Sequence, residues 1–577
     1  MTEIVELARR WVEQDPDPET KAAGALLIES GSGEVLASHF GHRLSFGTAG
    51  MRGALGPGPN RMNASMVIRV TSAVGQYVKQ RVDGACERGA VIGYDGRHGS
   101  RPFADYAARV LLAEGFKVYR FDSVVPTPRL AHALHALGGA VGIMVTASHN
   151  PPQDNGYKVY WEDGAQIIPP HDQGISAILD TIDNTMDIPL DDLAQGKLDG
   201  RLLSIPDSVQ NDYFESVQKL RVYSGPTPLK LVYSAMHGVG RASVERVLAE
   251  GGYANVHSVE AQAEPDPDFP TVSFPNPEED GAMDLSLELA SAIGADLILA
   301  NDPDADRLCV GIPHKGGYRL LTGNEIGVLL ADELLHYGHS AGDALVVTTI
   351  VSTSMLQKIA AAYGAKCAET LTGFKWLAHE GMKHQASGGH FAVGFEEAIG
   401  YSIGGLVRDK DGVSAALIFA DLASRAASAG LTVEDRLNQL YRRHGLYLTT
   451  QKSFVFPGQA GKETMDRMME SLRDSTPQTL DGSAIHMVKD YGTGQSREVD
   501  TAVVGHIDLP KSNVLGFHME NGSRLMVRPS GTEPKIKFYF EICESVQDAE
   551  SVDETSVRAS KRLASFVQST MAMFEQE

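Results

Sequence analysis

The chain has 577 residues, which is too long for one hydrophobic core and predicts roughly three to five domains of about 100–200 residues each. Its apolar content of 42% and its 59 glycines are typical of a globular protein with many tight turns. The net charge of −23 disfavours nucleic acid and anionic membranes as partners, so an anionic substrate would need a local basic pocket.

Two further patterns bear on the compartment. The four cysteines are far apart in the sequence and have no metal-ligand spacing, so we expect buried, reduced thiols. The first residues lack the basic and apolar regions of a signal peptide, and no apolar run of ~18 residues or more predicts a membrane span. We therefore expect a cytoplasmic protein with no membrane partner.

The amino-terminal part is expected to be helical. Residues 3 to about 38 predict a helix with an acidic face. The segment 46–53 follows, with three glycines and Arg52. A flexible backbone around a cation suits an anion, although a plain glycine turn is the commoner explanation of such a segment.

A strand, a polar turn, an amphipathic helix and a glycine stop recur at three places in the chain. The recurring strands are expected at residues 90–94, 230–234 and 344–349. Because the repeat is domain-sized, it predicts three related α/β domains in tandem rather than a solenoid. In the remaining residues the pattern is instead a helix, several strands and a C-terminal helix, which predicts a smaller C-terminal α+β domain. The expected domains are 1–205, 206–322, 323–455 and 456–577.

The segment 142–152 is an apolar, β-branched run that stops at Ser148, a histidine, an asparagine and two prolines. Proline cannot continue a hydrogen-bonded ladder, so Ser148 is expected at the tip of a buried strand with its hydroxyl free. That placement suits a nucleophile or a phosphate carrier. The alternative is an ordinary strand-to-loop turn.

Three aspartates, Asp302, Asp304 and Asp306, follow the strand expected at 295–300. Carboxylates at every second position can converge in a loop, and their oxygens suit Mg²⁺. An EF-hand is excluded because it needs a glycine and a glutamate where the chain has Arg307 and Pro313. An aspartyl-phosphate phosphatase motif is the other alternative, and the sequence shows no further partners for it.

Two later segments carry groups that suit a sugar phosphate. Glu396 and Glu397 lie between glycines, where carboxylates can accept hydrogen bonds from sugar hydroxyls, although a solvated turn competes with this interpretation. The nearby segment 408–412 adds a cation. The segment 525–535 combines arginine, hydroxyls, glycine and lysine, which together predict a phosphate cradle. The strand after it alternates, with one apolar face expected at Ile536, Phe538, Phe540 and Ile542.

In this order, four motifs resemble those of the α-D-phosphohexomutase family, the phosphoglucomutases and phosphomannomutases. They are Thr-Ala-Ser-His-Asn-Pro-Pro, Asp-Pro-Asp-Ala-Asp-Arg, Gly-Phe-Glu-Glu-Ala-Ile-Gly and Arg-Pro-Ser-Gly-Thr-Glu-Pro. The resemblance covers most of the chain and implies four domains around a central cleft. It implies an intramolecular phosphotransferase that interconverts a sugar 1-phosphate and 6-phosphate, with glucose phosphate as substrate. Glucose 1,6-bisphosphate would be the intermediate and activator, and the protein would be a monomer or a homodimer.

The resemblance also implies roles for single residues. Ser148 would be carried as phosphoserine, and an oxygen of it would bind Mg²⁺ together with the three aspartates. The catalytic end of the cleft would be lined by Arg52, His149, Lys158 and Arg307, with Lys158 as the candidate general acid/base. The substrate would be bound by Glu396, Lys410, Arg528, Ser530, Gly531, Thr532 and Lys535.

One position departs from the hexose-specific pattern. Ala398 stands where many such members have serine, and its surroundings resemble the phosphoglucomutase-2 branch, which includes phosphopentomutases and glucose-1,6-bisphosphate synthases. A pentose-phosphate mutase and a bisphosphate synthase that uses an acyl-phosphate donor are therefore alternatives to the glucose phosphate mutase. A non-catalytic sugar-phosphate binder is a third, against which the intact Ser148, the three aspartates and Lys158 argue.

Overall fold

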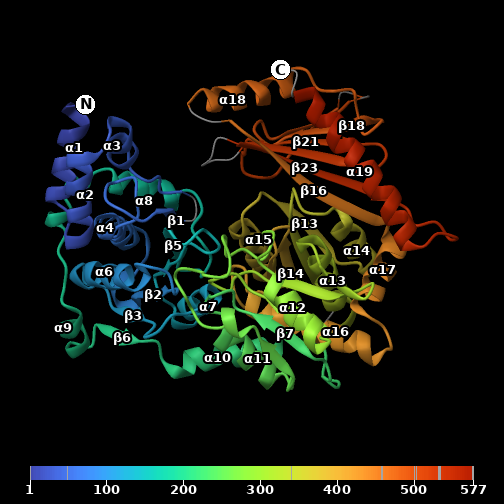
Figure 1. Cartoon of the computed structure of the whole chain (residues 1–577), viewed down its shortest axis with the longest axis horizontal. Helices are drawn as coiled ribbons and strands as arrows, with labels where there is room; N and C mark the ends of the chain where they lie inside the picture. The colour runs from blue at the N-terminus through green and yellow to red at the C-terminus, as the bar shows by residue number, and fades with distance from the viewer. Residues whose placement is uncertain are drawn as a thin grey trace. The chain divides into compact units, whose positions relative to one another are not determined.

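The computed structural model of the chain describes residues 2–47, 50–338, 341–456, 459–499, 501, 503–529 and 535–574 (Figure 1). The chain divides into two compact units, each assembled from separate segments. Unit 1 comprises Met1–Gly323, Gly381–Lys383 and Ala398–Ala429. Unit 2 comprises Asn324–Glu380, His384–Glu397 and Gly430–Glu577.

The amino-terminal part of unit 1 contains three helices, α1 (Thr2–Glu13), α2 (Pro18–Ser30) and α3 (Gly33–Phe40). The single helix expected over residues 3–38 is therefore wrong. The first break has a proline at the start of α2, and the Asp17 carboxylate caps that helix by accepting the Glu19 N–H at 2.9 Å. The second break lies at Gly31, and Ser32 caps α3.

A six-stranded mixed sheet with the order β1-β5-β4-β2-β3-β6 forms the first half of unit 1. Its strands β2, β3, β4 and β6 are parallel, whereas β5 and β1 form antiparallel pairs. The strands are β1 (Gly50–Ala54), β2 (Ala90–Tyr94), β3 (Val118–Arg120), β4 (Val141–Val145), β5 (Asp154–Trp161) and β6 (Leu202–Ser204). Because Tyr94 pairs with Val145, β2 and β4 end side by side, and the loops that follow them lie at the same edge.

Helices on this sheet bury its apolar, β-branched strands, since β2 and β4 are buried at every residue. The helices are α4 (Ala64–Arg81), α5 (Ala85–Arg88), α6 (Ser100–Ala113), α7 (Thr127–Leu137), α8 (His171–Leu179) and α9 (Leu193–Leu198).

A second mixed sheet, with the order β11-β10-β9-β7-β8, completes unit 1. Its strands are β7 (Leu231–Ser234), β8 (Val256–Ser258), β9 (Leu297–Ala300), β10 (Cys309–His314) and β11 (Gly317–Leu320). The helices are α10 (Asp207–Lys219), α11 (Arg241–Glu250) and α12 (Asp284–Ile293). Later in the chain, β15 (Gly400–Ile403) and α16 (Gly412–Ser428) also belong to unit 1, where α16 packs against α11.

Unit 2 contains a parallel sheet and a C-terminal antiparallel sheet. The parallel strands β13 (Lys366–Thr370), β12 (Ala344–Thr349) and β14 (His390–Glu396) lie in that order. Three helices accompany them: α13 (Gly323–Tyr337), α14 (Met355–Tyr363) and α15 (Phe374–Ala386).

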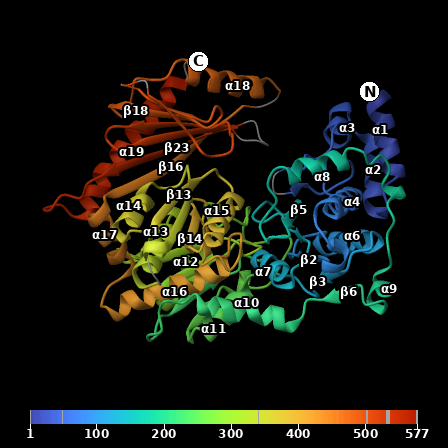
Figure 2. The same cartoon turned by 180° about the vertical axis from the view of Figure 1, so that it is seen from behind.

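The C-terminal sheet has the order β16-β23-β22-β21-β18-β19-β20, and α19 (Val552–Phe574) packs against β16 and β23 (Figure 2). Its strands are β16 (Leu446–Val455), β18 (Ser483–Asp490), β19 (Gln495–Glu498), β20 (Val504–His506), β21 (Leu515–Met519), β22 (Arg524–Pro529) and β23 (Lys535–Glu544), with the short β17 (Thr479–Leu480) beside β18. Two further helices are α17 (Val433–His444) and α18 (Gln459–Asp474).

The alternation expected after residue 535 is confirmed, because Ile536, Phe538, Phe540 and Ile542 are all buried. The opposite face is also partly buried, which alternation alone does not predict. Tyr539 joins a second apolar cluster, and Glu541 forms an ion pair with Arg524 at 2.7 Å.

The α/β fold class with a smaller C-terminal α+β part is confirmed. The three recurring units correspond to β2–α6–β3, β7–α11–β8 and β12–α14–β13. The four boundaries drawn from the sequence stay predictions. All four cysteines are free, and Cys309 is buried whereas the other three are partly exposed. Within the described residues no single helix is long and apolar enough to span a membrane. Helices α16 and α17 meet the criteria of length and composition only when they are taken together as a bent pair.

Candidate active site

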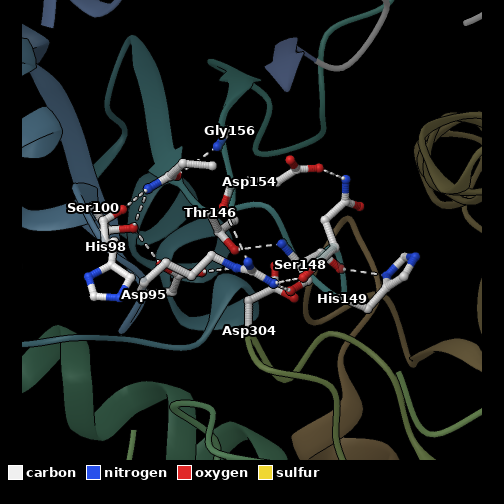
Figure 3. Close-up of polar contacts among 12 residues, drawn as sticks. Asp95, His98, Ser100, Thr146, Ser148, His149, Asp154, Gly156 and Asp304 are labelled. Carbon is white, nitrogen blue, oxygen red and sulfur yellow. Dashed lines mark hydrogen bonds and ion pairs between the residues drawn. The ribbon is translucent and has the colours of Figure 1, made fainter. Parts of the chain in front are cut away.

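Ser148 lies three residues beyond the end of β4 and is held in the left-handed region, with φ = +53°. A non-glycine residue in that region costs roughly 1–3 kcal/mol, so other contacts must hold it there. Its N–H donates to Thr146 Oγ1 at 2.9 Å. Its Oγ lies 3.1 Å from His149 Nδ1 (Figure 3). The same Oγ donates to Asp302 Oδ2 at 2.8 Å. The side chain is buried, so the hydroxyl is oriented by these contacts.

The loop after Ser148 is fixed by side chains from the neighbouring strand ends. Asn150 Nδ2 donates to Asp154 Oδ2 at 2.7 Å, and Arg52 donates to Asn150 Oδ1 at 2.7 Å. The guanidinium of Arg97 donates to backbone carbonyls of the loop, among them that of Ser148 at 2.6 Å. Asn155 donates to the His98 carbonyl at 2.7 Å (Figure 3). Side-chain hydrogen bonds therefore hold the loop at Ser148, Asn150, Asp154 and Asn155.

The three aspartates follow β9 and are fully buried, with carboxylate oxygens from all three within 4.8 Å of one another. The turn that brings them together has Ala305 at φ = +54°. Asn301 braces the turn, since its side chain accepts from Tyr233 OH at 2.8 Å and donates to the Arg307 carbonyl at 2.6 Å. Gly412 lies against that carbonyl so closely that a Cβ there would be 2.2 Å from the oxygen. The expected convergence of the three carboxylates is confirmed.

Two lysines partly balance these charges. Lys158, on β5, donates to Asp304 Oδ2 at 2.7 Å and to Asp306 Oδ2 at 3.0 Å. Lys410 donates to Asp306 Oδ2 at 2.7 Å. Burial alone would lower the pKa of Lys158, but the carboxylates of Asp304 and Asp306 outweigh it and raise that pKa, so the amine is charged. Lys410 is charged for the same reason, because Asp306 and Asp409 raise its pKa against the effect of burial.

The carboxylates fit a hard divalent cation. Asp302 uses Oδ1 to accept the Arg307 N–H at 3.0 Å and Oδ2 to accept the Ser148 hydroxyl. Asp304 Oδ1 and Asp306 Oδ1 are buried and, within the described residues, have no hydrogen-bond partner. Buried carboxylate oxygens left unpaired are costly, and oxygen is the ligand that Mg²⁺ prefers. The triad therefore fits the Mg²⁺ site that the sequence resemblance implies.

His149 and Arg307 complete the polar surroundings of Ser148. Burial lowers the pKa of His149 well below its usual value, and the nearby Arg307 and Arg52 lower it further. The imidazole is therefore neutral at pH 7. Arg307 also lies 3.5 Å from Glu278.

Apart from Lys410, which lies in unit 1, the predicted substrate-binding residues belong to unit 2. Glu396 ends β14, and its Oε1 accepts the Gly373 N–H at 2.8 Å. Glu397 Oε2 accepts a hydrogen bond from the Ser352 hydroxyl at 2.7 Å, so this second glutamate binds a side chain of its own unit. Arg528 lies near the end of β22 and Lys535 begins β23, which places both cations at the same end of an antiparallel pair. The predicted Ser530, Gly531 and Thr532 lie outside the described residues.

In unit 1 the structure brings together the predicted residues from distant segments around the Ser148 hydroxyl and the carboxylates. These are Arg52, Ser148, His149, Lys158, Asp302, Asp304, Asp306, Arg307 and Lys410. Two further residues were missed by sequence reasoning: Arg97, and Thr127, whose Oγ1 donates to Asp304 Oδ2 at 2.6 Å. The sequence position of Arg97 was a signal, because the residue comes just after β2, the strand that pairs in parallel with β4.

Comparison with known proteins places this geometry in a family. Four consecutive segments match the Phosphoglucomutase/phosphomannomutase family: its alpha/beta/alpha domain I at residues 43–186, domain II at 211–316, domain III at 322–444 and the C-terminal domain at 488–558.

Similar sequences and structures agree with this match. A probable phosphoribomutase of Schizosaccharomyces pombe is 38% identical over 93% of this chain and 93% of its own. A phosphoglucomutase of Staphylococcus epidermidis is 34% identical over 86% of this chain and 90% of its own. The crystal structure of a putative phosphomannomutase from Thermus thermophilus, 22% identical, shares the fold with a TM-score of 0.66 and covers 92% of this chain and 99% of its own. The chain therefore belongs to the phosphoglucomutase/phosphomannomutase family and is a phosphosugar mutase.

Proposed function

We propose that Ser148 is the residue that carries the phosphoryl group between the two positions of the sugar. The observation that supports this most is its buried hydroxyl, held in a strained conformation 2.8 Å from Asp302 and 3.1 Å from a neutral imidazole. A serine that served only in a turn would need neither contact. The strain is consistent with a group held for transfer rather than for stability.

In the forward half-reaction, the bond between phosphorus and Ser148 Oγ breaks and a bond to the free sugar hydroxyl forms. The hydroxyl proton leaves the sugar, and Oγ regains a proton. Lys158, the proposed general acid/base, is charged and can donate the proton that Oγ regains. His149 is neutral, with Nδ1 within hydrogen-bond distance of Oγ, and can accept the proton that leaves the sugar hydroxyl. The bisphosphate then returns its other phosphoryl group to Ser148, and the same proton transfers run in reverse.

Mg²⁺ bound by Asp302, Asp304, Asp306 and an oxygen of the phosphorylated Ser148 would supply positive charge to the transferring group. The chain's own cations act in the same sense: Arg52, Arg307 and Lys410 offset negative charge near Ser148. Glu396 is proposed to bind sugar hydroxyls. Arg528, Lys535 and three residues between them in the sequence, Ser530, Gly531 and Thr532, are proposed to bind the phosphate that is not reacting.

For the sugar, we propose that pentose phosphates are accepted alongside glucose phosphates. Ala398 follows Glu396 and Glu397 and offers no hydroxyl to a hexose, whereas the glutamate that would bind the shared hydroxyls is retained. The similarity to a phosphoribomutase over nearly the whole chain supports this choice. The sequence-based expectations of a cytoplasmic location and of a monomer or homodimer remain proposals.

The first experiment tests the phosphoryl carrier. Incubation with glucose 1,6-bisphosphate and Mg²⁺ should add one phosphate to the intact mass, at Ser148, and none to Ser148→Ala, which should also lose turnover. Ser286→Ala is a matched control, because Ser286 is likewise a buried serine of unit 1. Full turnover by Ser148→Ala would contradict the proposal.

The second experiment separates the mutase from a bisphosphate synthase. Glucose 1-phosphate and ribose 1-phosphate are each supplied with a catalytic amount of bisphosphate, with and without a stoichiometric acyl phosphate. A mutase turns over many times without the acyl phosphate. Product formation that stops when the donor is exhausted would favour the synthase.

A further inference from the structure

The side chain of Arg97 is buried beneath the loop that carries Ser148. It follows β2, and its two terminal nitrogens point at carbonyl groups of residues 148–154. One nitrogen donates to Pro151 O at 2.8 Å and to Asp154 O at 3.2 Å. The other donates to Ser148 O at 2.6 Å and also to Asn150 O. A single guanidinium therefore binds four carbonyls of one short loop.

Four carbonyl oxygens that point at one place repel each other, because each is the negative end of a peptide dipole. A positive, planar group with paired donors offsets this repulsion and matches the spread of the oxygens. A lysine ammonium carries the same charge but has three donors on one nitrogen, so it cannot reach two pairs of carbonyls at once. The loop conformation therefore depends on the guanidinium shape and not only on its charge.

Arg97 is itself held in place. Asp95 Oδ2 lies 3.5 Å from its Nε, and Asp95 Oδ1 accepts Ser100 Oγ at 2.6 Å (Figure 3). The guanidinium carbon of Arg97 also lies over the ring of Phe269, 4.8 Å from the ring centroid. With a carboxylate at one edge, an aromatic ring on the face and the loop at the other edge, the guanidinium has one available orientation.

These contacts bear on the direction of the Ser148 hydroxyl. The carbonyl of Ser148 is bound by Arg97, and its N–H is bound by Thr146, so both sides of this left-handed residue are fixed. We propose that Arg97 is a positioning residue of the phosphoryl transfer: it holds Ser148 so that Oγ faces Asp302, and it touches no reacting atom. This inference rests on the proposed role of Ser148 as phosphoryl carrier.

The test uses Arg97→Lys in the full-length chain, with Arg69→Lys as the matched control. Arg69 lies on α4 of the same unit, and its guanidinium also binds two carbonyls, those of Ile182 and Asp183 at 3.3 Å each. Two quantities are measured on each variant: the hydrogen exchange of the peptide covering residues 147–156, and kcat and KM for the sugar phosphate.

In Arg97→Lys, we expect the amides of Ser148, Asn150 and Asp154 to exchange at least tenfold faster, with the amides of β2 and β4 unchanged. We expect kcat to fall about tenfold and KM to stay within threefold, because the proposed sugar- and phosphate-binding residues are untouched. Arg69→Lys should leave both the loop exchange and kcat within twofold of the wild type.

Loop exchange like that of the wild type, or a fall in kcat of less than threefold, overturns the proposal. If Arg97→Lys cannot be isolated folded, Phe269→Leu applies the same test, since this variant keeps the guanidinium and removes the ring that fixes it. Unchanged loop exchange and unchanged kcat in Phe269→Leu would also overturn the proposal.

The positioning role of Arg97 and the carrier role of Ser148 are refuted by different results. A wild-type protein that gains no phosphate at Ser148 refutes the carrier, whereas a phosphorylated wild type with an unaffected Arg97→Lys refutes only the positioning role.

Discussion

The three aspartates that follow β9 have two kinds of hydrogen-bond partner in unit 1, a serine hydroxyl and lysine ammonium groups. Asp302 accepts the hydroxyl that would carry the phosphoryl group, whereas Asp304 and Asp306 accept bonds from Lys158 and Lys410. The remaining oxygens of Asp304 and Asp306 are buried without a partner among the described residues. Unpaired carboxylate oxygens gathered at one place suit a hard divalent cation such as Mg²⁺.

Replacing one of these aspartates is expected to remove metal binding and turnover together. Asp306→Asn keeps the shape but removes a charge, so the affinity for Mg²⁺ should fall, and kcat should fall roughly tenfold for each ~1.4 kcal/mol of transition-state stabilisation lost. Titration calorimetry with Mg²⁺ and steady-state rates measure the two effects. Asp421→Asn, a buried carboxylate paired with Arg221 in the same unit, should leave Mg²⁺ affinity unchanged. Undiminished rates in excess chelator would contradict the metal requirement.

Position 398 is expected to set part of the sugar preference. A serine hydroxyl there could bond a hexose hydroxyl and contribute about 0.5–1.5 kcal/mol, a factor of roughly 2–13. Ala398→Ser should therefore raise kcat/KM for glucose 1-phosphate relative to ribose 1-phosphate by about that factor. The measurement is kcat/KM for both sugars in both proteins. If the wild type rejects ribose 1-phosphate by several orders of magnitude and the serine changes nothing, position 398 has no such role.

At the scale of the element, the carboxylate of Asp411 both caps helix α16 and binds a tyrosine of helix α10. Asp411 caps the helix by accepting the Val413 and Ser414 N–H groups at 3.0 and 3.1 Å, and it also accepts Tyr213 OH at 2.9 Å. Asp411→Ala should lower the free energy of unfolding of unit 1 by about 2–4 kcal/mol, the sum of a lost cap and an unpaired buried hydroxyl. Chemical denaturation followed by hydrogen exchange in α16 measures this loss.

The control for that prediction is Thr432→Ala. Thr432 caps α17 in a reciprocal capping box with Asp435, but its capping contacts are exposed, so the expected cost is only about 1 kcal/mol and falls on unit 2. Equal losses from the two variants would show that burial and the Tyr213 contact add nothing to the cap.

The sequence predicted elements well where local patterns decide them. The alternation of β23, the strand before Ser148 and the spacing of the three aspartates each depend on neighbouring residues, and the structure has them as expected. The single amino-terminal helix was wrong because residues 14–17 and 31–32 carry signals that end and start helices: proline and the cap at Asp17 separate α1 from α2, and Gly31 and the cap at Ser32 separate α2 from α3. Thr127 was missed because its role depends on a partner 177 residues away, which no local pattern reveals. Arg97 has its partner 51 residues away, and only its position just after a predicted strand could have pointed to it.

The whole molecule is expected to unfold in more than one step, because its two units are compact separately. All three aspartates of the proposed Mg²⁺ site lie in unit 1, so Mg²⁺ should raise only the transition of that unit. At a concentration of about 100 times Kd the added stability is roughly 2.7 kcal/mol. Calorimetry with and without Mg²⁺, with each transition assigned by hydrogen exchange, makes the measurement. Asp302→Asn should abolish the shift, and an equal rise of both transitions would contradict the assignment of the metal to unit 1.

The interleaving of the two units along the chain has a consequence for synthesis on the ribosome. Residues 324–380 and 384–397 of unit 2 are made before Ala398–Ala429, which unit 1 needs for Lys410, for Asp411 and for α16. At about 5–20 residues per second, unit 1 waits roughly 5–20 s for its last segment after Gly323 has been added. During that interval the nascent chain has Tyr213 and one face of α11 without the groups that cover them in the finished protein. The part of the enzyme that is synthesised first therefore stays incomplete until residue 429 has been added, and a chaperone that binds exposed apolar surface would have an opportunity to act during that interval.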